Sequence, residues 1–230
     1  VLYEMYKPYV GKFLVIENIV EMQKHTQNLL NQYFSKFYKK GSIETGKNKL
    51  IFEVCKKHIN RLLNQEKKII QAKKQLKIIA LEKELQAQIT IEGVKFPVKI
   101  KGIVDRIDEL DGVTRIIDYK TGKVESSQLK IVDFSSINTN YKYTKAMQVM
   151  LYSYLFSATA SKVVSHLQSG VISFKNLNSG FIKMNFSANR TADNLVSNER
   201  IDTFMNEIKN MILEILNPEL PFIQNENLPF

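Results

Sequence analysis

The chain of 230 residues contains one cysteine, no tryptophan and no long apolar run. The single cysteine, Cys55, excludes an internal disulfide and is typical of a reducing compartment. No apolar run approaches the roughly 18 to 20 residues that span a bilayer, and the first residues carry no signal-peptide pattern. We therefore expect a cytoplasmic protein without a membrane partner. An apolar content of 44% is enough for one sizeable core.

Arginine is also scarce, although the chain is strongly basic. Lysine and arginine number 33 against 23 acidic residues, for a net charge of +10 and a pI near 9.4, and only five of the 33 are arginines. This charge predicts attraction to a polyanion, and nucleic acid is the first candidate. Lysine favours loose phosphate contacts over bidentate reading of bases, so we expect sequence-independent binding.

Two short segments, GIVDRID and IIDYKTG, place carboxylates on what reads as one β-hairpin. They flank Asp111 and Gly112, a dipeptide that favours a two-residue hairpin turn. With that turn, Asp105 lies directly opposite Asp118, and like charges so placed need a cation between them. Oxygen ligands of this kind suit Mg²⁺ or Mn²⁺. Lys120 projects on the same face as Asp118, which gives the groups of a metal-dependent phosphodiesterase.

The polar and aromatic residues of these segments and their surroundings also allow a purely structural interpretation. The two carboxylates alone could mark a solvated sheet face, but each follows a pair of apolar β-branched residues that indicates the buried middle of a sheet. Asp108 and Arg115 fall on the opposite face, where an ordinary cross-strand ion pair is expected. Tyr141, Tyr143 and Tyr154 could stack on bases, although tyrosines around a helix start more often pack.

The Asp-spacer-Asp-x-Lys arrangement resembles the PD-(D/E)XK nuclease superfamily. The blocks GIVDRID, IIDYKTG and QVMLY are similar to those of its RecB/AddB-type exonuclease branch, and they run in that order from Gly102 to Tyr152. The resemblance implies an α/β (α+β) fold with a restriction-endonuclease-like core. That core would be a central mixed sheet of about four to five strands flanked by helices.

The resemblance also implies roles for residues of the hairpin. Asp105 and Asp118 would be metal ligands, joined by the main-chain carbonyl of Tyr119, and Lys120 would orient or activate the attacking water. Glu82 matches the acidic residue that often precedes the first block and is a further metal-ligand candidate.

Residues outside the hairpin complete the implied site. Gln148 and Tyr152 match the Q-xxx-Y helix of the family, and their spacing of four places both on one helix face, toward the site or DNA. The family pattern includes a histidine on an upstream helix that contributes to the metal site. Neither His25, His58 nor His166 can be assigned to it from sequence.

These features predict a Mg²⁺- or Mn²⁺-dependent DNA exonuclease. By resemblance, such domains often form the C-terminal part of a helicase–nuclease used in recombination and repair, so a helicase subunit or a helicase domain of the same chain is an implied partner. The start at Val1 without methionine fits a domain cut from a longer chain. Some members of the branch hold an iron–sulfur cluster on four cysteines, which Cys55 alone cannot build.

Two alternatives of other kinds stay open. One is a catalytically silent nucleic-acid-binding or scaffolding module with the same fold, against which the intact Asp/Asp/Lys set argues. The other is a site-specific restriction enzyme, which would need base-reading loops and is disfavoured by the shortage of arginine.

Hydrophobic periodicity predicts a helical N-terminal region over residues 1–80, and the resemblance implies a PD-(D/E)XK nuclease core over residues 81–230, on which this region packs. The predicted helices cover residues 17–38, 47–74, 143–159 and 198–216, and the predicted strands cover residues 85–92, 96–106, 113–120, 171–176 and 181–186.

Overall fold

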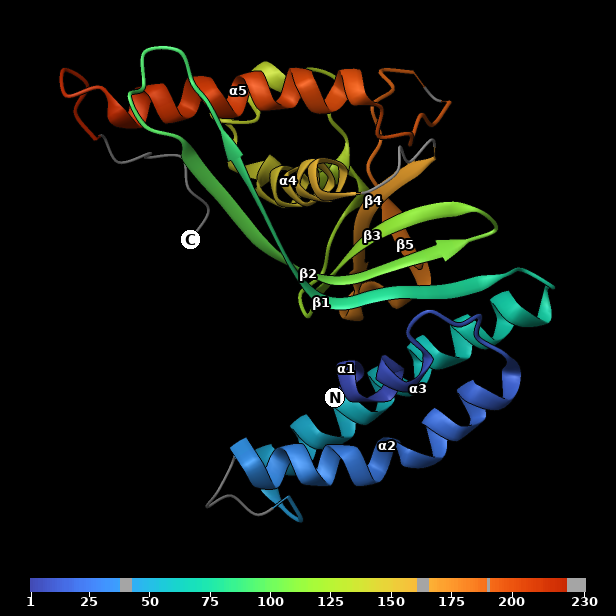
Figure 1. Ribbon diagram of the computed structural model, residues 1–230. Coiled ribbons are helices and arrows are strands. Elements are labelled where there is room, and N and C mark those ends of the chain that lie inside the picture. Colours follow the sequence, from blue (N-terminus) through green and yellow to red (C-terminus); the bar gives the residue numbers. More distant parts are fainter. Residues whose placement is uncertain (38–42, 161–165, 190, 223–230) are drawn as a thin grey trace.

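The computed structural model describes residues 1–37, 43–160, 166–189 and 191–222. Its centre is a five-stranded mixed sheet in the order β1-β2-β3-β4-β5 (Figure 1). The strands are β1 (Leu76–Ile89), β2 (Val98–Leu110), β3 (Val113–Lys120), β4 (Leu167–Ser173) and β5 (Phe181–Lys183). The predicted mixed sheet flanked by helices, with helices ahead of it, is confirmed.

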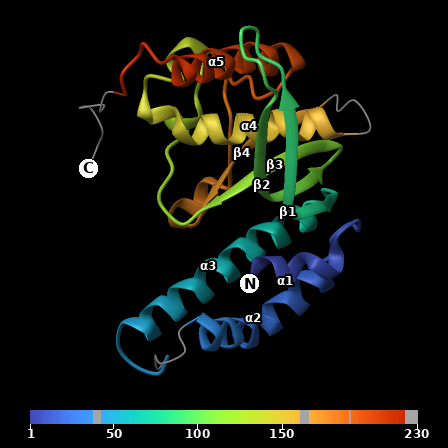
Figure 2. The same cartoon turned by 60° about the vertical axis from the view of Figure 1, so that its left-hand side comes forward.

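Helices cover both faces of the sheet. In Figures 1 and 2, α1, α2 and α3 lie on one side and α4 and α5 on the other. The α-helices are α1 (Leu2–Tyr6), α2 (Ile16–Phe37), α3 (Gly46–Gln71), α4 (Thr144–Thr159) and α5 (Asn198–Leu216). Short 3₁₀ helices are η1 (Lys7–Tyr9), η2 (Ser126–Leu129), η3 (Phe134–Ser136), η4 (Tyr141–Tyr143) and η5 (Phe174–Ser179). No helix among the described residues is both long and apolar enough to cross a membrane.

The first three strands form the predicted antiparallel meander. The turn between β2 and β3 has φ of 50° at Asp111 and 81° at Gly112, the two positive values that a type I′ hairpin turn requires. The predicted register is confirmed for the five pairs from Arg106–Ile117 to the turn. β4 then pairs with β3 in parallel, and the connection between them contains α4, as a parallel crossover requires.

Several predicted boundaries are wrong. β1 begins at Leu76 rather than residue 85. Just after α3, Lys73 has a left-handed φ of 61°, which ends the helix. The strand then starts with buried and half-buried residues in alternation. β4 begins at Leu167, where it pairs with Thr114 of β3, and ends at Ser173, whose side chain caps η5. β5 ends at Lys183 rather than residue 186. The predicted end of the first long helix, residue 38, lies outside the described residues.

Two large apolar clusters flank the sheet. One joins β1–β4 to α4 and α5. The other joins α1, α2 and α3 to Leu76 and Ile78 at the start of β1. Because β1 contributes to both clusters, the structure has no obvious break at residue 80, and the partition there stays a prediction.

Beyond the end of β3, β1 and β2 continue as a long two-stranded hairpin. Figures 1 and 2 show that both strands change direction and that the hairpin passes alongside α4 to reach α5. Within β1, Glu82 has a φ of 43°, which breaks the extended backbone. The inner face of the hairpin, including Leu85 and Val104, belongs to the core that contains α4. This bend separates the two strands from β3 next to the predicted site.

Candidate active site

The lysine and one carboxylate of β3 are linked directly to α4. Lys120 Nζ lies 2.8 Å from Asp118 Oδ2 and donates to Gln148 Oε1 at 2.7 Å. Gln148 Nε2 in turn donates to the hydroxyl of Tyr152 at 2.7 Å. The structure therefore brings four of the predicted site residues into one continuous chain of contacts, with the helical pair on one face of α4 as their spacing predicts.

Asp105 lies where β2 and β3 separate. The regular pairing of these strands ends at Arg106–Ile117, so Asp105 and Asp118 occupy the next position of the same register. There Asp105 Oδ2 accepts a hydrogen bond from the backbone N–H of Tyr119 at 2.7 Å. In a strand the N–H and C=O of one residue point to the same side, so the Tyr119 carbonyl also faces this opening.

The carboxyl group of Asp118 lies in a buried environment beside charged groups. Asp118 is only 3% exposed. Burial raises the pKa of its carboxyl; the Lys120 ammonium opposes this shift, and the Asp105 carboxylate adds to it. Asp118 Oδ2 is buried without a well-formed hydrogen bond, and its contact is the ion pair with Lys120. A site with two carboxylates and the Tyr119 carbonyl fits Mg²⁺, which takes one or two carboxylates and leaves its other positions to water and phosphate.

Glu82 stands beside Asp105 on the neighbouring strand. It lies between the paired residues Leu81–Arg106 and Lys83–Val104, which places it across from Asp105. Both line a cavity of about 560 Å³ between the sheet and the N-terminal helices. Among the described residues, however, no group of three or more histidine, cysteine, aspartate or glutamate side chains is close enough to hold a metal ion. The role of Glu82 as a ligand stays a prediction.

One histidine that the sequence alone could not assign to the site lines the same cavity. Of the three histidines, His58 on α3 lines it together with Glu82 and Asp105. Burial, and then the nearby Arg61 and Lys57, lower the pKa of His58. Its Nδ1 atom is buried without a hydrogen-bond partner. A neutral imidazole with a free nitrogen is the form that binds metals.

A buried charge network supports the opposite face of the same strands. Arg106, fully buried, lies 2.6 Å from Glu66 Oε1 of α3 and 2.7 Å from Asp108 Oδ2. Arg115 donates twice to Asp108, at 2.6 and 2.8 Å, which confirms the predicted cross-strand pair. Tyr6 of α1 donates to the second oxygen of Glu66 at 2.7 Å. Two cations and two anions balance here, directly behind the proposed carboxylates.

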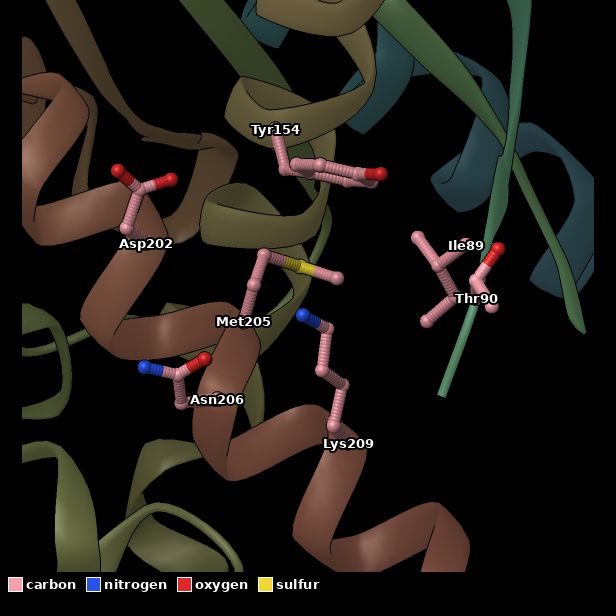
Figure 3. Close-up of a pocket in the computed structure, with 7 residues that line it drawn as sticks. All are labelled: Ile89, Thr90, Tyr154, Asp202, Met205, Asn206 and Lys209. Atoms are coloured by element: carbon pink, nitrogen blue, oxygen red, sulfur yellow. The ribbon is translucent and has the colours of Figure 1, made fainter. Parts of the chain in front are cut away.

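The tyrosines that could have stacked on bases mainly pack. Tyr154 lies in a separate pocket of about 360 Å³. Figure 3 shows its ring on α4 facing the end of β1 at Ile89, with Met205 and Lys209 of α5 across the hollow. Burial raises the pKa of Tyr154, and Tyr143 also packs against the core. Tyr141, which is 56% exposed, is the exception.

The fold and the site together define an α/β protein whose mixed sheet carries paired carboxylates and a lysine at a hairpin opening. A family model of the PD-(D/E)XK nuclease superfamily matches residues 12–227. The chain therefore belongs to the PD-(D/E)XK nuclease superfamily, which indicates a nuclease whose substrate is DNA. Members of this superfamily typically use divalent metals such as Mg²⁺ or Mn²⁺. No curated protein matches the chain.

Proposed function

We propose that the chain is a metal-dependent DNA exonuclease of the RecB/AddB type that hydrolyses phosphodiester bonds. The observation that carries the proposal is the chain of contacts from Asp118 through Lys120 and Gln148 to Tyr152, with Asp105 beside it. The family membership supports nuclease chemistry. Exonuclease action, association with a helicase and a role in recombination and repair rest on the resemblance of the three sequence blocks.

Asp105, Asp118 and the Tyr119 carbonyl would hold Mg²⁺ or Mn²⁺. Glu82 and His58, which line one cavity with Asp105 and Tyr119, are candidates for further ligands, directly or through water. When bound, such an ion lowers the pKa of a coordinated water and neutralises charge on the phosphoryl oxygens.

The side chains of the protein would contribute orientation and positive charge. The Lys120 ammonium, held between Asp118 and Gln148, stabilises the negative charge that grows on the phosphoryl group and positions the attacking water. Tyr152 fixes the direction of the Gln148 amide, because the amide nitrogen that donates to Tyr152 leaves the oxygen facing Lys120. Tyr152 therefore acts on Lys120 through Gln148, as a positioning residue.

The experiment compares cleavage of end-labelled linear and closed circular DNA, single- and double-stranded, with Mg²⁺, Mn²⁺ or EDTA. Lys120→Ala should lose about 10²- to 10³-fold in rate, the usual effect of removing one charge-stabilising group. Asp118→Ala should cut nothing, and both variants should still retain DNA in a gel shift at low salt. Lys123→Ala, which removes a 65% exposed lysine three residues away, is the matched control.

Each outcome has a definite meaning. Metal-dependent loss of linear DNA alone supports an exonuclease, whereas loss of circular DNA supports an endonuclease such as a restriction enzyme. Wild-type rates in Lys120→Ala and Asp118→Ala would refute the site. Binding without cleavage in any metal would favour the silent binding module.

A further inference from the structure

A polar pocket lies beside β5, the strand at the opposite edge of the sheet from β1. We call it the β5 pocket; its volume is about 380 Å³, and its polar lining residues are Ser126, Ser127, Lys130, Lys183, Asn185 and Asn194. Ile182, which also lines it, pairs with Val171 of β4, and Val171 pairs with Asp118. Because neighbouring strands are about 4.8 Å apart, Ile182 lies roughly 10 Å across the sheet from Asp118. The pocket is therefore separate from the proposed active site.

Backbone pairing brings the two lysines of the β5 pocket to the same side. Lys130 and Asn185 form a parallel β-bridge, and the backbone of Asn185 exchanges hydrogen bonds of 2.9 Å with Ile131 and Leu129. Lys183 precedes Asn185 by two residues and projects on the same side, because side chains alternate along an extended chain. Residues two apart on such a chain are separated by about 6.7 Å. Two flexible lysine side chains at this spacing can contact one anion.

The positive charge of the β5 pocket is not balanced by carboxylates in the described part of the chain. Its lining there contains two lysines and no acidic residue. The acidic residues next to the lining in sequence are paired with other cations. Glu125 lies 2.6 Å from Lys123 Nζ, and Asp193 Oδ1 accepts from Arg200 at 2.9 Å.

Lys183 is also close to further cations. Burial, and then the charges of Arg115 and Lys74, lower the pKa of its ammonium group. An anion bound beside Lys183 would offset this repulsion, so the electrostatics of the pocket favour a negatively charged ligand.

We propose that the β5 pocket binds a phosphate monoester together with the sugar that carries it, either in a free nucleotide or at a phosphorylated end of DNA. A phosphate monoester carries about −1.5 to −2 charges at pH 7, which matches the two unbalanced lysines. Lysine binds phosphate as a point charge. The inference goes beyond the proposed function, because none of the lining residues belongs to the proposed active site.

The uncharged residues of the pocket supply further hydrogen-bonding groups. Asn185 Oδ1 accepts from the backbone N–H groups of Ser187 and Asp193, at 3.0 and 3.2 Å, so the Nδ2 donors of the same amide are left for a ligand. The hydroxyls of Ser126 and Ser127 can donate to the phosphate or accept from the sugar. A volume of about 380 Å³ is within the usual range for small-molecule sites, and it leaves room for the sugar.

The test titrates ¹⁵N-labelled protein with thymidine 5′-monophosphate or with thymidine, in EDTA at constant ionic strength, and follows amide chemical shifts by NMR. The nucleotide should bind and shift the amides of Ser127 and Asn185, whereas thymidine should not. Lys130→Gln/Lys183→Gln should raise the Kd at least tenfold, because two charge-assisted hydrogen bonds are lost. Lys130→Arg/Lys183→Arg, which keeps both charges, should bind as the wild type does. Unchanged thermal midpoints would show that the variants fold.

The matched control is Lys47→Gln/Lys49→Gln, which removes the same charge from two exposed lysines at the start of α3, away from β5 in Figure 1. The proposal would be overturned if thymidine bound as tightly as the nucleotide. It would also be overturned if Lys130→Gln/Lys183→Gln bound the nucleotide like the wild type, or if the control lost as much affinity.

A second comparison identifies the source of the phosphate. Blunt duplexes with and without 5′-phosphates are bound in EDTA by the wild type and by Lys130→Gln/Lys183→Gln. Tighter binding of the phosphorylated duplex that disappears in the variant assigns the β5 pocket to DNA ends. Equal binding of the two duplexes by the wild type assigns it to a free nucleotide.

Discussion

The ring of Tyr152 on α4 lies against the backbone of Gly102 on β2. A Cβ atom at residue 102 would come within 2.8 Å of Tyr152 Cε1 and 3.2 Å of Cδ1. Contacts that short force one of the two groups to move. The hairpin therefore approaches α4 closely because residue 102 has no side chain, and this approach sets the position of the tyrosine that holds Gln148.

Gly102→Ala should disturb catalysis more than binding. The added methyl group would push the Tyr152 ring away and weaken its hydrogen bond with Gln148, which releases Lys120. A shift of about 1 Å in a catalytic group can cost up to roughly 10²-fold in rate, so we expect a tenfold or larger fall in kcat with little change in KM. Gly122→Ala, where nothing lies within 4 Å of the new atom, is the control. An unchanged kcat would show that the link to Tyr152 is dispensable.

Asp118→Asn should stabilise the metal-free protein at neutral pH. Burial raises the pKa of Asp118 above its ordinary value of 3.8, so the folded state binds its proton more tightly than the unfolded state. Stability from this group is present at pH values below the unfolded pKa and is lost as the pH rises through the folded pKa. Denaturant unfolding in EDTA should show a gain for the variant at pH 7 that shrinks toward pH 4.

The control for this prediction is a carboxylate whose pKa is lowered rather than raised. The exposed Asp133 accepts hydrogen bonds from Ser135, which lower its pKa. Asp133→Asn should give no gain in stability at pH 7. If Asp118→Asn were less stable than the wild type at pH 7, the ion pair with Lys120 would outweigh the cost of burial.

Arg106→Met should destabilise the fold strongly. It leaves the buried carboxylates of Glu66 and Asp108 without their shared cation. Breaking a buried ion pair from one side costs about 3–5 kcal/mol. Urea unfolding should show this loss, whereas Lys123→Met, which breaks an exposed pair with Glu125, should leave the unfolding midpoint unchanged. Similar midpoints for the two variants would contradict the structural role of the network.

Asp111→Ala should weaken the turn that sets the register of β2 and β3. Alanine at a φ of 50° costs roughly 1–2 kcal/mol, and the change also removes the Asp111 Oδ1 acceptor for the backbone N–H of Gln75, 2.8 Å away. Asp111→Asn keeps an acceptor and tolerates the left-handed conformation, so its unfolding temperature should be close to that of the wild type. Thermal unfolding of the two variants distinguishes these expectations.

Local sequence signals were enough to predict the hairpin and the helix beside it. The Asp111-Gly112 turn fixes the register, and a spacing of four places Gln148 and Tyr152 on one face of α4. These features depend on a few neighbouring residues, so they can be read without knowing the rest of the fold. The positions of the carboxylates relative to Lys120 follow from the same short segment.

Features that depend on distant segments could not be predicted. Glu66 belongs to a lysine-rich stretch that reads as a solvated helix face, yet it is 4% exposed because α3 places it against Arg106, 40 residues away. His58 was indistinguishable from the other histidines, because its place in one cavity with Asp105 follows from how α3 packs on the sheet. The start of β4 depends on its parallel pairing with β3, for which the local sequence holds no signal.

The contact between Glu66 and Arg106 has a consequence for how the protein unfolds. The helical region and the strand that carries Asp105 share one buried pair of opposite charges, so separating them breaks this ion pair and leaves the Arg106 guanidinium with only one of its two carboxylate partners. We expect α3 and the sheet to melt as one cooperative unit, with a single calorimetric transition. Limited proteolysis should accordingly fail to release a stable fragment that begins at β1.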